Sequence, residues 1–222
     1  MRSGILFSGG KDSVYAAHLA KKEGHELSCL ISIFSKNEDS YMFHTPSIEK
    51  VRSQAKVMKV PLLTQETNGK KEEELIDLEL AIKNAIEKYK IECIITGAIQ
   101  SVYQASRIQK VCKKLNIECF NPLWQKDETE YLLELIGNNF KVIITAVAAY
   151  PLDKSWVGRE IDEKYLEEVK ELNEIYKIHV AGEGGEFETF VLDCPLFEKP
   201  LKIKEQKIIG EDNAWRMEVE IE

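Results

Sequence analysis

One short stretch near the start of the chain, Ser8–Ser13 with the sequence SGGKDS, constrains the fold more than any other. The apolar run Ile5–Phe7 precedes it, and the helical pattern Val14–Ala20 follows it. A buried strand is therefore expected to turn sharply into a helix. Adjacent glycines can adopt positive φ and leave no Cβ in the way of a ligand, so successive backbone N–H groups can converge on one anion. The first turn of the helix adds unpaired N–H groups and the positive end of its dipole, so the stretch predicts a phosphate-binding turn.

The side chains of this stretch fit the same chemistry. Serine hydroxyls donate hydrogen bonds, a lysine supplies a positive charge, and the carboxylate of Asp12 could hold Mg²⁺ against phosphate oxygens. The residues expected to contact nucleotide phosphates are Ser8, Gly9, Gly10, Lys11, Asp12 and Ser13.

The spacing excludes the two most frequent nucleotide-binding loops. In a P-loop counted from Gly4, Gly10 stands where lysine is required. A dinucleotide motif G-x-G-x-x-G does not follow the first strand, and the later GEG at 182–184 has Phe187 in place of a third glycine. What remains, S-G-G-x-D-S between a strand and a helix, resembles the PP-loop of the N-type ATP pyrophosphatases. That resemblance implies cleavage of ATP to AMP and pyrophosphate.

The composition is that of a globular protein with an apolar core. The 222 residues are 44% hydrophobic and 31% charged. No stretch approaches about eighteen apolar residues, and the first strand follows Ser3 directly, so the sequence predicts neither a membrane span nor a signal peptide and favours the cytoplasm. The cysteines are odd in number and none are spaced C-x-x-C, which favours reduced, mostly buried thiols.

Charge is unevenly distributed along the chain. Residues 1–125 carry 18 Lys and Arg against 15 Asp and Glu, a net +3, whereas residues 126–222 carry 12 against 23, a net −11. The acidic half argues against a broad nucleic-acid footprint and fits a protein or cationic partner, although such charge is also typical of a solvated helix face. We therefore expect no direct nucleic-acid partner.

The order of the predicted elements indicates two domains. Strands alternate with helices as far as Trp124, which predicts a Rossmann-like α/β fold of the adenine nucleotide alpha hydrolase (HUP) type. Its five-stranded parallel sheet should have right-handed crossovers and strand order 3-2-1-4-5. The pattern changes near Gln125. We therefore expect a PP-loop ATP-binding domain over residues 1–125 and a smaller α/β subdomain, for substrate, over residues 126–222.

Further candidates lie where predicted strands end, because ligands bind at the carboxyl edge of a parallel sheet. Gly97 ends the fourth strand and would let a base or ribose approach closely. Tyr103, Gln104 and Arg107 begin the next helix as substrate-binding candidates, and Tyr103 and Arg107 share a face that could hold an anion or stack on a ring. Pairing of Arg107 with a neighbouring acid is the alternative. Ile33, in the second strand, completes the expected nucleotide-binding set.

A polar loop, Ser35–Thr45, leaves the second strand at the same edge. Its aromatic residues and His44 are consistent with a lid over substrate, in which His44 binds substrate. The alternative is that these side chains pin the loop to the core.

A second glycine-rich stretch, Gly182–Thr189, carries three glycines and three carboxylates in eight residues. It could simply join two strands, with solvated glutamates. Glu183 and Glu186 flank a glycine pair, however, so they can project from a tight turn to bind a cation or accept protons from an amine. We count both, with Glu188, as substrate-binding candidates. The catalytic candidates of the whole chain are Lys11, Asp12, Glu183 and Glu186.

Together these motifs resemble those of the diphthine–ammonia ligase (diphthamide synthase) family. The resemblance covers essentially the whole chain, and the second glycine-rich stretch and the Tyr103-Gln104 segment narrow it beyond PP-loop enzymes in general. The segments that carry it are Ser8–Ser13, Ser40–His44, Gly97–Arg107, Pro122–Trp124, Trp156–Arg159 and Gly182–Thr189.

The resemblance implies the last step of diphthamide synthesis on translation elongation factor 2. The diphthine carboxylate would attack the α-phosphorus of ATP, pyrophosphate would leave into the Ser8–Ser13 turn, and ammonia would convert the acyl-adenylate to the amide. The implied cofactors are ATP and Mg²⁺, with Asp12 as the metal ligand. No glutaminase domain is expected, so the nitrogen source would be free ammonium. The trimethylammonium group of diphthine would contact Glu183, Glu186 or a ring such as Tyr103 or Trp124.

Two other functions stay open from the sequence. A PP-loop enzyme that thiolates or aminates tRNA would be expected to have a C-x-x-C pair or a basic RNA-binding surface, and neither is visible. A non-catalytic adenine-nucleotide-binding protein would bind AMP or ATP without releasing pyrophosphate. The sequence leaves the oligomeric state open, a homodimer included.

Overall fold

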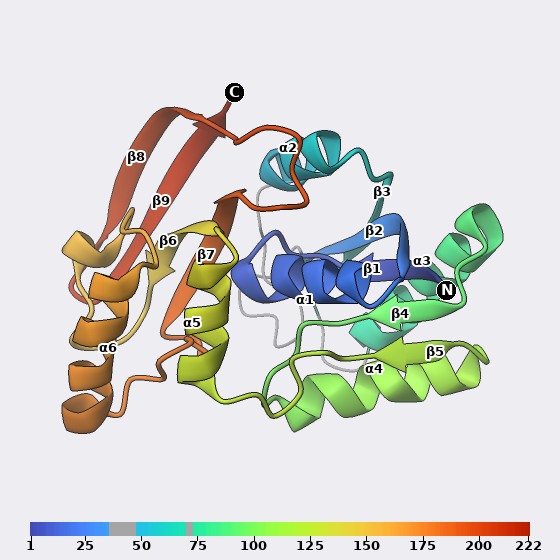
Figure 1. Cartoon of the computed structure of the whole chain (residues 1–222), viewed down its shortest axis with the longest axis horizontal. Helices are drawn as coiled ribbons and strands as arrows, with labels where there is room; N and C mark the ends of the chain where they lie inside the picture. Colours follow the sequence, from blue (N-terminus) through green and yellow to red (C-terminus); the bar gives the residue numbers. More distant parts are fainter. Residues whose placement is uncertain (36–47, 70–72) are drawn as a thin grey trace. The chain divides into compact units, whose positions relative to one another are not determined.

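The chain folds into two compact units, Met1–Trp124 and Gln125–Glu222. A computed structural model describes residues 1–35, 48–69 and 73–222 (Figure 1). Each unit has a sheet and helices of its own, and the two sheets differ in kind. The units are therefore described separately.

The first unit is built on a five-stranded parallel sheet in the order β3-β2-β1-β4-β5, which confirms the predicted topology. Its strands are β1 (Arg2–Leu6), β2 (Glu26–Ser35), β3 (Leu62–Thr67), β4 (Cys93–Ile95) and β5 (Glu118–Phe120). The helices between them are α1 (Lys11–Lys22), α2 (Ile48–Met58), α3 (Glu73–Tyr89) and α4 (Val102–Lys114).

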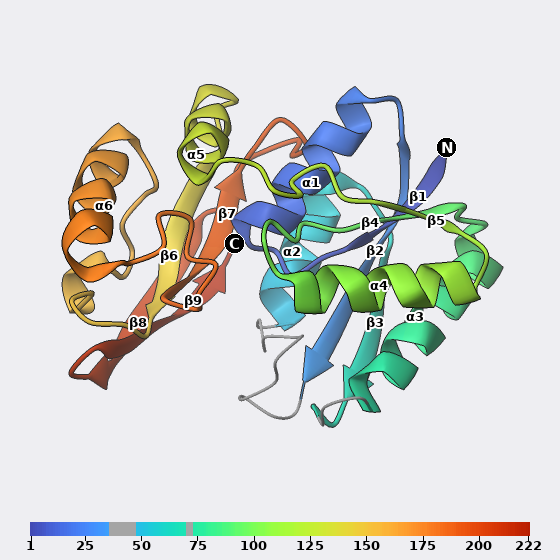
Figure 2. The same ribbon diagram turned by 90° about the horizontal axis from the view of Figure 1, so that it is seen from below.

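This strand order determines which face of the sheet each helix covers. The chain crosses the sheet in one direction from β1 to β3 and in the other from β3 through β4 to β5. Right-handed crossovers therefore place α1 and α2 on one face and α3 and α4 on the other (Figure 2). One buried cluster joins Leu78 and Ile82 of α3 with Ile31 of β2 and Ile94 of β4. Because all strands are parallel, the turns after β1 and β4 lie at the same edge of the sheet.

The second unit holds an antiparallel sheet in the order β7-β6-β9-β8. The strand β9 pairs with β8 along most of its length but with β6 only at Ala146↔Arg216 and Val147↔Trp215. The elements of this unit are α5 (Glu128–Gly137), β6 (Lys141–Val147), the 3-10 helix η1 (Lys154–Trp156), α6 (Glu163–Tyr176), β7 (Phe187–Asp193), β8 (Ile203–Glu211) and β9 (Ala214–Ile221).

The strand β7 begins earlier than the sequence pattern indicates. The apolar run Phe190–Leu192 predicts a strand that begins at Phe190, but pairing with β6 starts at Phe187. Phe187 and Phe190 are buried, whereas Glu188 is exposed. The second glycine-rich stretch is therefore a short turn over residues 182–186 followed by a strand, and Glu188 belongs to the strand.

Two further features concern membrane spans and the cysteines. Within the described residues, no helix is both long and apolar enough to span a bilayer. All five cysteines are free thiols and four of them are buried, as expected. Burial raises the pKa of Cys29 and of Cys194 to about 12, so these thiols are poor nucleophiles near neutral pH.

Candidate functional site

The turn after β1 has the backbone of a phosphate-binding loop, with one difference from the expectation. Only Gly9 adopts positive φ (83°), whereas Gly10 is extended (φ −77°, ψ 168°). Gly10 is the N-cap of α1, and in the part of the chain that the structure describes no side chain caps this helix start. The first-turn N–H groups of α1 therefore keep the ability to bind an anion.

The turn is organised around the hydroxyl of Ser13. The N–H groups of Ser8 and Gly9 donate to Ser13 Oγ at 3.3 and 3.2 Å, and Ser8 Oγ donates to it at 3.2 Å. Ser13 Oγ in turn donates to the carbonyl of Gly10 at 3.1 Å. The donors predicted to meet a phosphate thus converge on one buried oxygen, which shows that the turn can direct them to a single acceptor.

Gln54 of α2 supports this turn and was not among the sequence candidates. It is fully buried, and its Nε2 donates to the carbonyl of Gly9 at 2.9 Å. A Cβ on Gly9 would lie 2.3 Å from Gln54 Oε1, so the glycine is required by this contact as well as by its φ. A sequence signal existed: Gln54 is three residues after Val51 and four before Met58, inside the apolar stripe of its helix.

Lys11 and Asp12 form an ion pair at the start of α1. Lys11 Nζ lies 3.0 Å from both carboxylate oxygens of Asp12. The lysine side chain is 4% exposed and that of Asp12 is 28% exposed. Both predicted catalytic groups therefore sit at the turn, with the acid on the more accessible side.

Gly97, after β4, contacts the same helix start. A Cβ at this position would lie 2.6 Å from the carbonyl oxygen of Asp12 and 2.9 Å from the nitrogen of Ser13. The space that the glycine leaves is filled by backbone of the turn. Packing between β4 and α1 therefore explains this glycine, and its predicted approach to a base or ribose stays a prediction.

The predicted pair on α4 is brought together as expected. The Arg107 guanidinium lies over the Tyr103 ring, with Cζ 3.5 Å from the centroid, which is a close cation–π contact. Ser101 caps the helix through its Oγ, which accepts from the Gln104 N–H at 3.3 Å. One face of Tyr103 is thus occupied by Arg107, which leaves less of the ring for another cation.

Two sequence candidates lie elsewhere. Ile33 is buried in the cluster beneath α3 and α4. His44 and the other residues of the predicted lid from 36 onwards lie outside the described residues. The roles predicted for both stay predictions.

The turn at 182–186 belongs to the second unit and is held by the segment before it, which a side chain of α5 contacts in turn. Glu186 Oε1 accepts from the N–H of His179 at 3.0 Å, and the N–H of Glu183 donates to His179 Nδ1 at 3.3 Å. Glu128, the first residue of α5, accepts from the Val180 N–H at 3.0 Å, and its other oxygen lies 2.7 Å from His179 Nε2. Neither Glu128 nor His179 was a sequence candidate.

The three predicted glutamates have different environments. Glu186 Oε2 is buried and, among the described residues, has no hydrogen-bond partner. Glu183 is partly buried, and Glu188 is exposed on β7. Burial raises the pKa of Tyr165, whose hydroxyl donates to the Val180 carbonyl at 3.0 Å beneath the turn. Glu186 is therefore the glutamate whose carboxylate is both held and left with an open acceptor.

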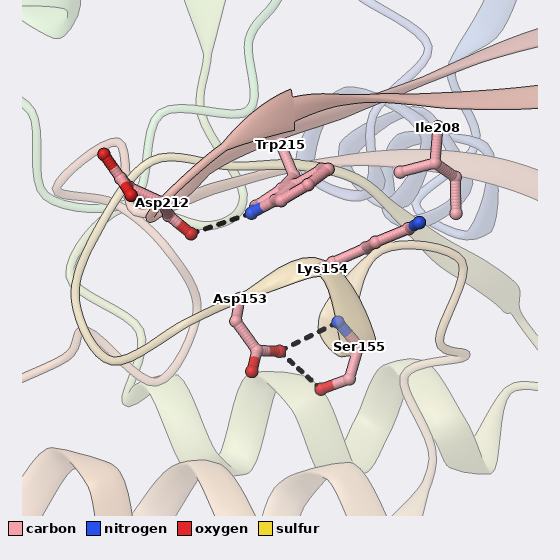
Figure 3. Close-up of a pocket in the computed structure, with 6 residues that line it drawn as sticks. All are labelled: Asp153, Lys154, Ser155, Ile208, Asp212 and Trp215. Carbon is pink, nitrogen blue, oxygen red and sulfur yellow. Dashed lines mark hydrogen bonds between the residues drawn. The ribbon is translucent and has the colours of Figure 1, made fainter.

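A pocket of about 590 Å³ lies between η1 and the β8–β9 hairpin, lined by Asp153, Lys154, Ser155, Ile208, Asp212 and Trp215 (Figure 3). Asp153 Oδ1 accepts from the Ser155 N–H and hydroxyl at 2.8 and 2.6 Å, which lowers its pKa. Trp215 Nε1 donates to the Asp212 carbonyl at 2.8 Å. The Asp153 contacts cap η1, and the Trp215 contact closes the turn between β8 and β9. The described lining contains no residue of the Ser8–Ser13 turn or of the turn at 182–186.

Comparison with known proteins identifies the family. The model of the diphthamide synthase N-terminal domain matches residues 1–119, and that of the diphthamide synthase C-terminal domain matches residues 127–220. The chain belongs to the diphthamide synthase family. This membership confirms the resemblance seen in the sequence.

Two relatives and one solved structure are similar to this chain. A diphthamide synthase relative from Bos taurus, named diphthine–ammonia ligase, is 36% identical over 230 residues, 94% of this chain and 85% of its own. A Schizosaccharomyces pombe protein of the same name is 31% identical and aligns over 92% of this chain but 36% of its own. The structure of a predicted subunit of tRNA methyltransferase from Methanocaldococcus jannaschii covers 88% of this chain and 98% of its own, with 20% identity and a TM-score of 0.45.

Proposed function

We propose that the chain is an ATP-dependent ligase that converts the carboxylate of diphthine on translation elongation factor 2 to the amide of diphthamide, with ammonia as the nitrogen source. The observation that carries the proposal is the match of both diphthamide synthase models, which together span the two units. The relatives named diphthine–ammonia ligase support the same reaction. The Ser8–Ser13 turn supports ATP as the source of energy, because its donors converge on one acceptor at the start of a helix.

In this proposal the first unit binds ATP and stabilises the departing pyrophosphate. A carboxylate oxygen is a poor leaving group for attack by an amine, so the diphthine carboxylate first attacks the α-phosphorus. Pyrophosphate leaves with the electrons of the broken P–O bond. The N–H groups of the turn and the Lys11 ammonium stabilise the negative charge that develops there. Release of Ser13 Oγ from its contacts with Ser8 and Gly9 provides these donors.

The family and the chemistry of the turn imply Mg²⁺, and Asp12 is the residue of the turn that fits this ion. No cluster of three or more His, Cys, Asp or Glu side chains able to hold a metal occurs among the described residues. Asp12 offers one partly exposed carboxylate. That donor set suits Mg²⁺, which is commonly held by one or two carboxylates together with phosphate oxygens. When bound, the ion would neutralise phosphate charge, with Asp12 as its protein ligand.

The second unit would supply the groups that receive ammonia and the diphthine side chain. Attack of ammonia on the acyl-adenylate carbonyl forms the C–N bond, AMP leaves, and the nitrogen loses one proton. Glu186 Oε2 is a buried acceptor suited to take that proton, because Oε1 is already bound to the backbone. Glu183 and Glu188 would attract the trimethylammonium group, in keeping with the net −11 charge of residues 126–222. A cytoplasmic location accords with an elongation-factor substrate.

The test measures products. Purified protein with ATP, ammonium chloride and diphthine-bearing elongation factor 2 should release AMP and pyrophosphate and add an amide to the factor, as seen by mass spectrometry. Glutamine in place of ammonium should give no turnover. ADP with phosphate as products, or AMP formation independent of the factor, would rule the proposal out.

A further inference from the structure

The segment that leads into the second glycine turn has neither helix nor strand over residues 177–186, yet Ile178, Val180 and Ala181 within it are buried. Val180 and Ala181 are 7% and 0% exposed. A buried segment without secondary structure needs partners for its backbone groups from elsewhere in the chain. Here the partners come from α5, α6 and the residue after β6.

Each end of the segment is tied to a different element. The Ile178 carbonyl accepts from Asn173 Nδ2 of α6 at 2.8 Å, and the Val180 carbonyl accepts from the Tyr165 hydroxyl at 3.0 Å. The Glu186 carbonyl accepts from the N–H of Ala148 at 2.8 Å. These bonds fix where the segment runs, but none of them touches the carboxylate of Glu186.

The orientation of that carboxylate depends on His179 and Glu128. Glu186 Oε1 is held by the backbone N–H of His179, so the direction of Oε2 follows the position of this peptide. Glu128 holds the two neighbouring parts of residue 179: it accepts from the N–H of the following peptide, at Val180, and its other oxygen lies 2.7 Å from the His179 imidazole. Gly184 leaves room for the arrangement, since a Cβ there would lie 2.7 Å from Glu186 Oε1.

The imidazole connects α5 to the turn itself. Its Nδ1 accepts from the Glu183 N–H, so a neutral ring carries its hydrogen on Nε2, which lies 2.7 Å from Glu128 Oε1 but is not aligned for a hydrogen bond to it. One ring thus links Glu128, at the start of α5, to the backbone N–H of Glu183 in the turn.

The geometry points to Glu128 and His179 as positioning residues that set the direction of Glu186 Oε2 and the closure of the turn at 182–186. The inference rests on the proposed function for the role of Glu186 in the reaction. It adds two residues that do not touch substrate and act through Glu186 and Glu183.

Two substitutions at His179 separate its two contacts. His179→Asn keeps an acceptor near the place of Nδ1, for the Glu183 N–H, and loses the contact with Glu128. His179→Gln keeps a donor near the place of Nε2, for Glu128, and loses the acceptor for the turn. Because Glu128 also binds the Val180 N–H, we expect His179→Asn to retain kcat within about threefold and His179→Gln to lose about tenfold, the effect of one buried hydrogen bond.

Glu128→Gln tests the other partner. Two donors face the Glu128 carboxylate, and an amide can accept only one of them, so kcat should fall about tenfold. Glu130→Gln is the matched control, because it removes the same charge from the first turn of α5 at an exposed position, whereas Glu128 is partly buried. KM for ATP should stay within about twofold in all four variants, since the proposed ATP site lies in the other unit.

A spectroscopic measurement keeps the inference testable without activity. In ¹⁵N NMR spectra of the full chain, His179 should show hydrogen on Nε2, and the Glu183 amide should lose protection from hydrogen exchange in His179→Gln but not in His179→Asn. A ring with hydrogen on Nδ1, or equal exchange and equal kcat in both variants, overturns the inference. Absence of turnover in the unsubstituted protein would instead count against the proposed function, and the NMR result would still decide the positioning roles.

Discussion

The two glycine turns of this protein are held in contrasting ways. The turn at Ser8–Ser13 closes mainly on itself, through a serine hydroxyl five residues from its partner, and one neutral amide from α2 supports it. The turn at 182–186 is held by ionisable side chains, of which Glu128 is 52 residues away from the backbone it binds. The geometry of a turn that its own residues stabilise can be recognised from a short sequence motif. The geometry of a turn that depends on a residue far along the chain cannot be recognised in this way.

Each turn contains a glycine at which an added Cβ would clash with a neighbouring side chain. Gly9 has φ 83° and faces Gln54, and Gly182 has φ 74° and faces the ring of Phe187. The comparison therefore predicts that damage to one turn should change nucleotide binding and damage to the other should change use of the protein substrate.

The largest effect on activity is expected for Gly97→Ala, which tests how closely this residue after β4 packs against the first turn. Its Cβ would meet backbone atoms of Asp12 and Ser13 at 2.6 to 2.9 Å, and backbone cannot move aside as a side chain can. We expect a loss of about 1–3 kcal/mol in the free energy of unfolding and a fall of about a hundredfold in AMP formation, because the helix start is displaced. Urea unfolding and product assays provide the measurements.

Gly137→Ala is the control for that experiment. Nothing lies within 4 Å of a Cβ built at Gly137, the last residue of α5. Unfolding free energy should be unchanged or rise by up to about 1 kcal/mol. If Gly97→Ala were equally harmless, the tight packing of β4 against the first turn would be wrong.

The next effect compares the turns directly through matched pairs of glycines. Gly9→Ala and Gly24→Ala both place a side chain at positive φ, but of these two only Gly9 has a neighbour within 4 Å of the new Cβ. In the second unit, Gly182 is the crowded glycine and Gly185 the open one. Gly24→Ala and Gly185→Ala should lose about 1–2 kcal/mol from backbone strain. Gly9→Ala and Gly182→Ala should lose at least about 1 kcal/mol more.

Kinetics then decide whether the turns have separate roles. Gly9→Ala should raise the Kd for ATP measured by calorimetry, and Gly182→Ala should lower kcat/KM for elongation factor 2 while leaving that Kd unchanged. Impairment of the same parameter by both substitutions would break the contrast between the turns.

A smaller effect is expected for Gln54→Leu, which removes the amide that supports the first turn. The Gly9 carbonyl would lose a buried donor, at a cost of about 1–3 kcal/mol. If the unsatisfied Gly9 carbonyl destabilises the ATP-bound protein more than the free protein, the Kd for ATP should rise about five- to tenfold. Gln54→Glu replaces the donor by an acceptor and should be no better than leucine. An unchanged Kd in Gln54→Leu would show that the turn needs no support from α2.

The smallest effect concerns acid stability of the first unit alone. Lys83 and Lys114 lie 2.7 and 2.6 Å from Glu79 and lower the pKa of its carboxyl, joining α3 to α4. A lowered pKa in the folded state stabilises the protein above the ordinary carboxyl pKa, and this stabilisation disappears as the pH falls through the lowered value. Glu79→Gln should therefore reduce the urea midpoint at pH 7 and converge with the unsubstituted protein at low pH. Exposed Glu87, on the same helix, provides the control Glu87→Gln, which should not show this convergence.

The sequence predicted the first unit well because its signals are local or periodic. Strand order follows from alternation and handedness, and the Ser8–Ser13 motif contains the residues that close its own turn. Gln54 acts 45 residues from Gly9, and its sole signal was a polar residue within an apolar stripe. Glu128 had no signal at all, because a glutamate in the first turn of a helix is favourable for any helix. The start of β7 was missed because three glycines and a glutamate indicate a turn, while pairing with β6 decides where the strand begins.

The ion pair between Lys11 and Asp12 has a consequence for selectivity. The turn carries its own counter-ion, so a bare anion such as sulfate gains the lysine only by leaving the carboxylate without its cation. A pyrophosphate that arrives with a metal ion offers a new partner to both charges at once. If the turn binds ATP as proposed, it is therefore expected to discriminate against free phosphate and sulfate and to prefer the metal-complexed nucleotide.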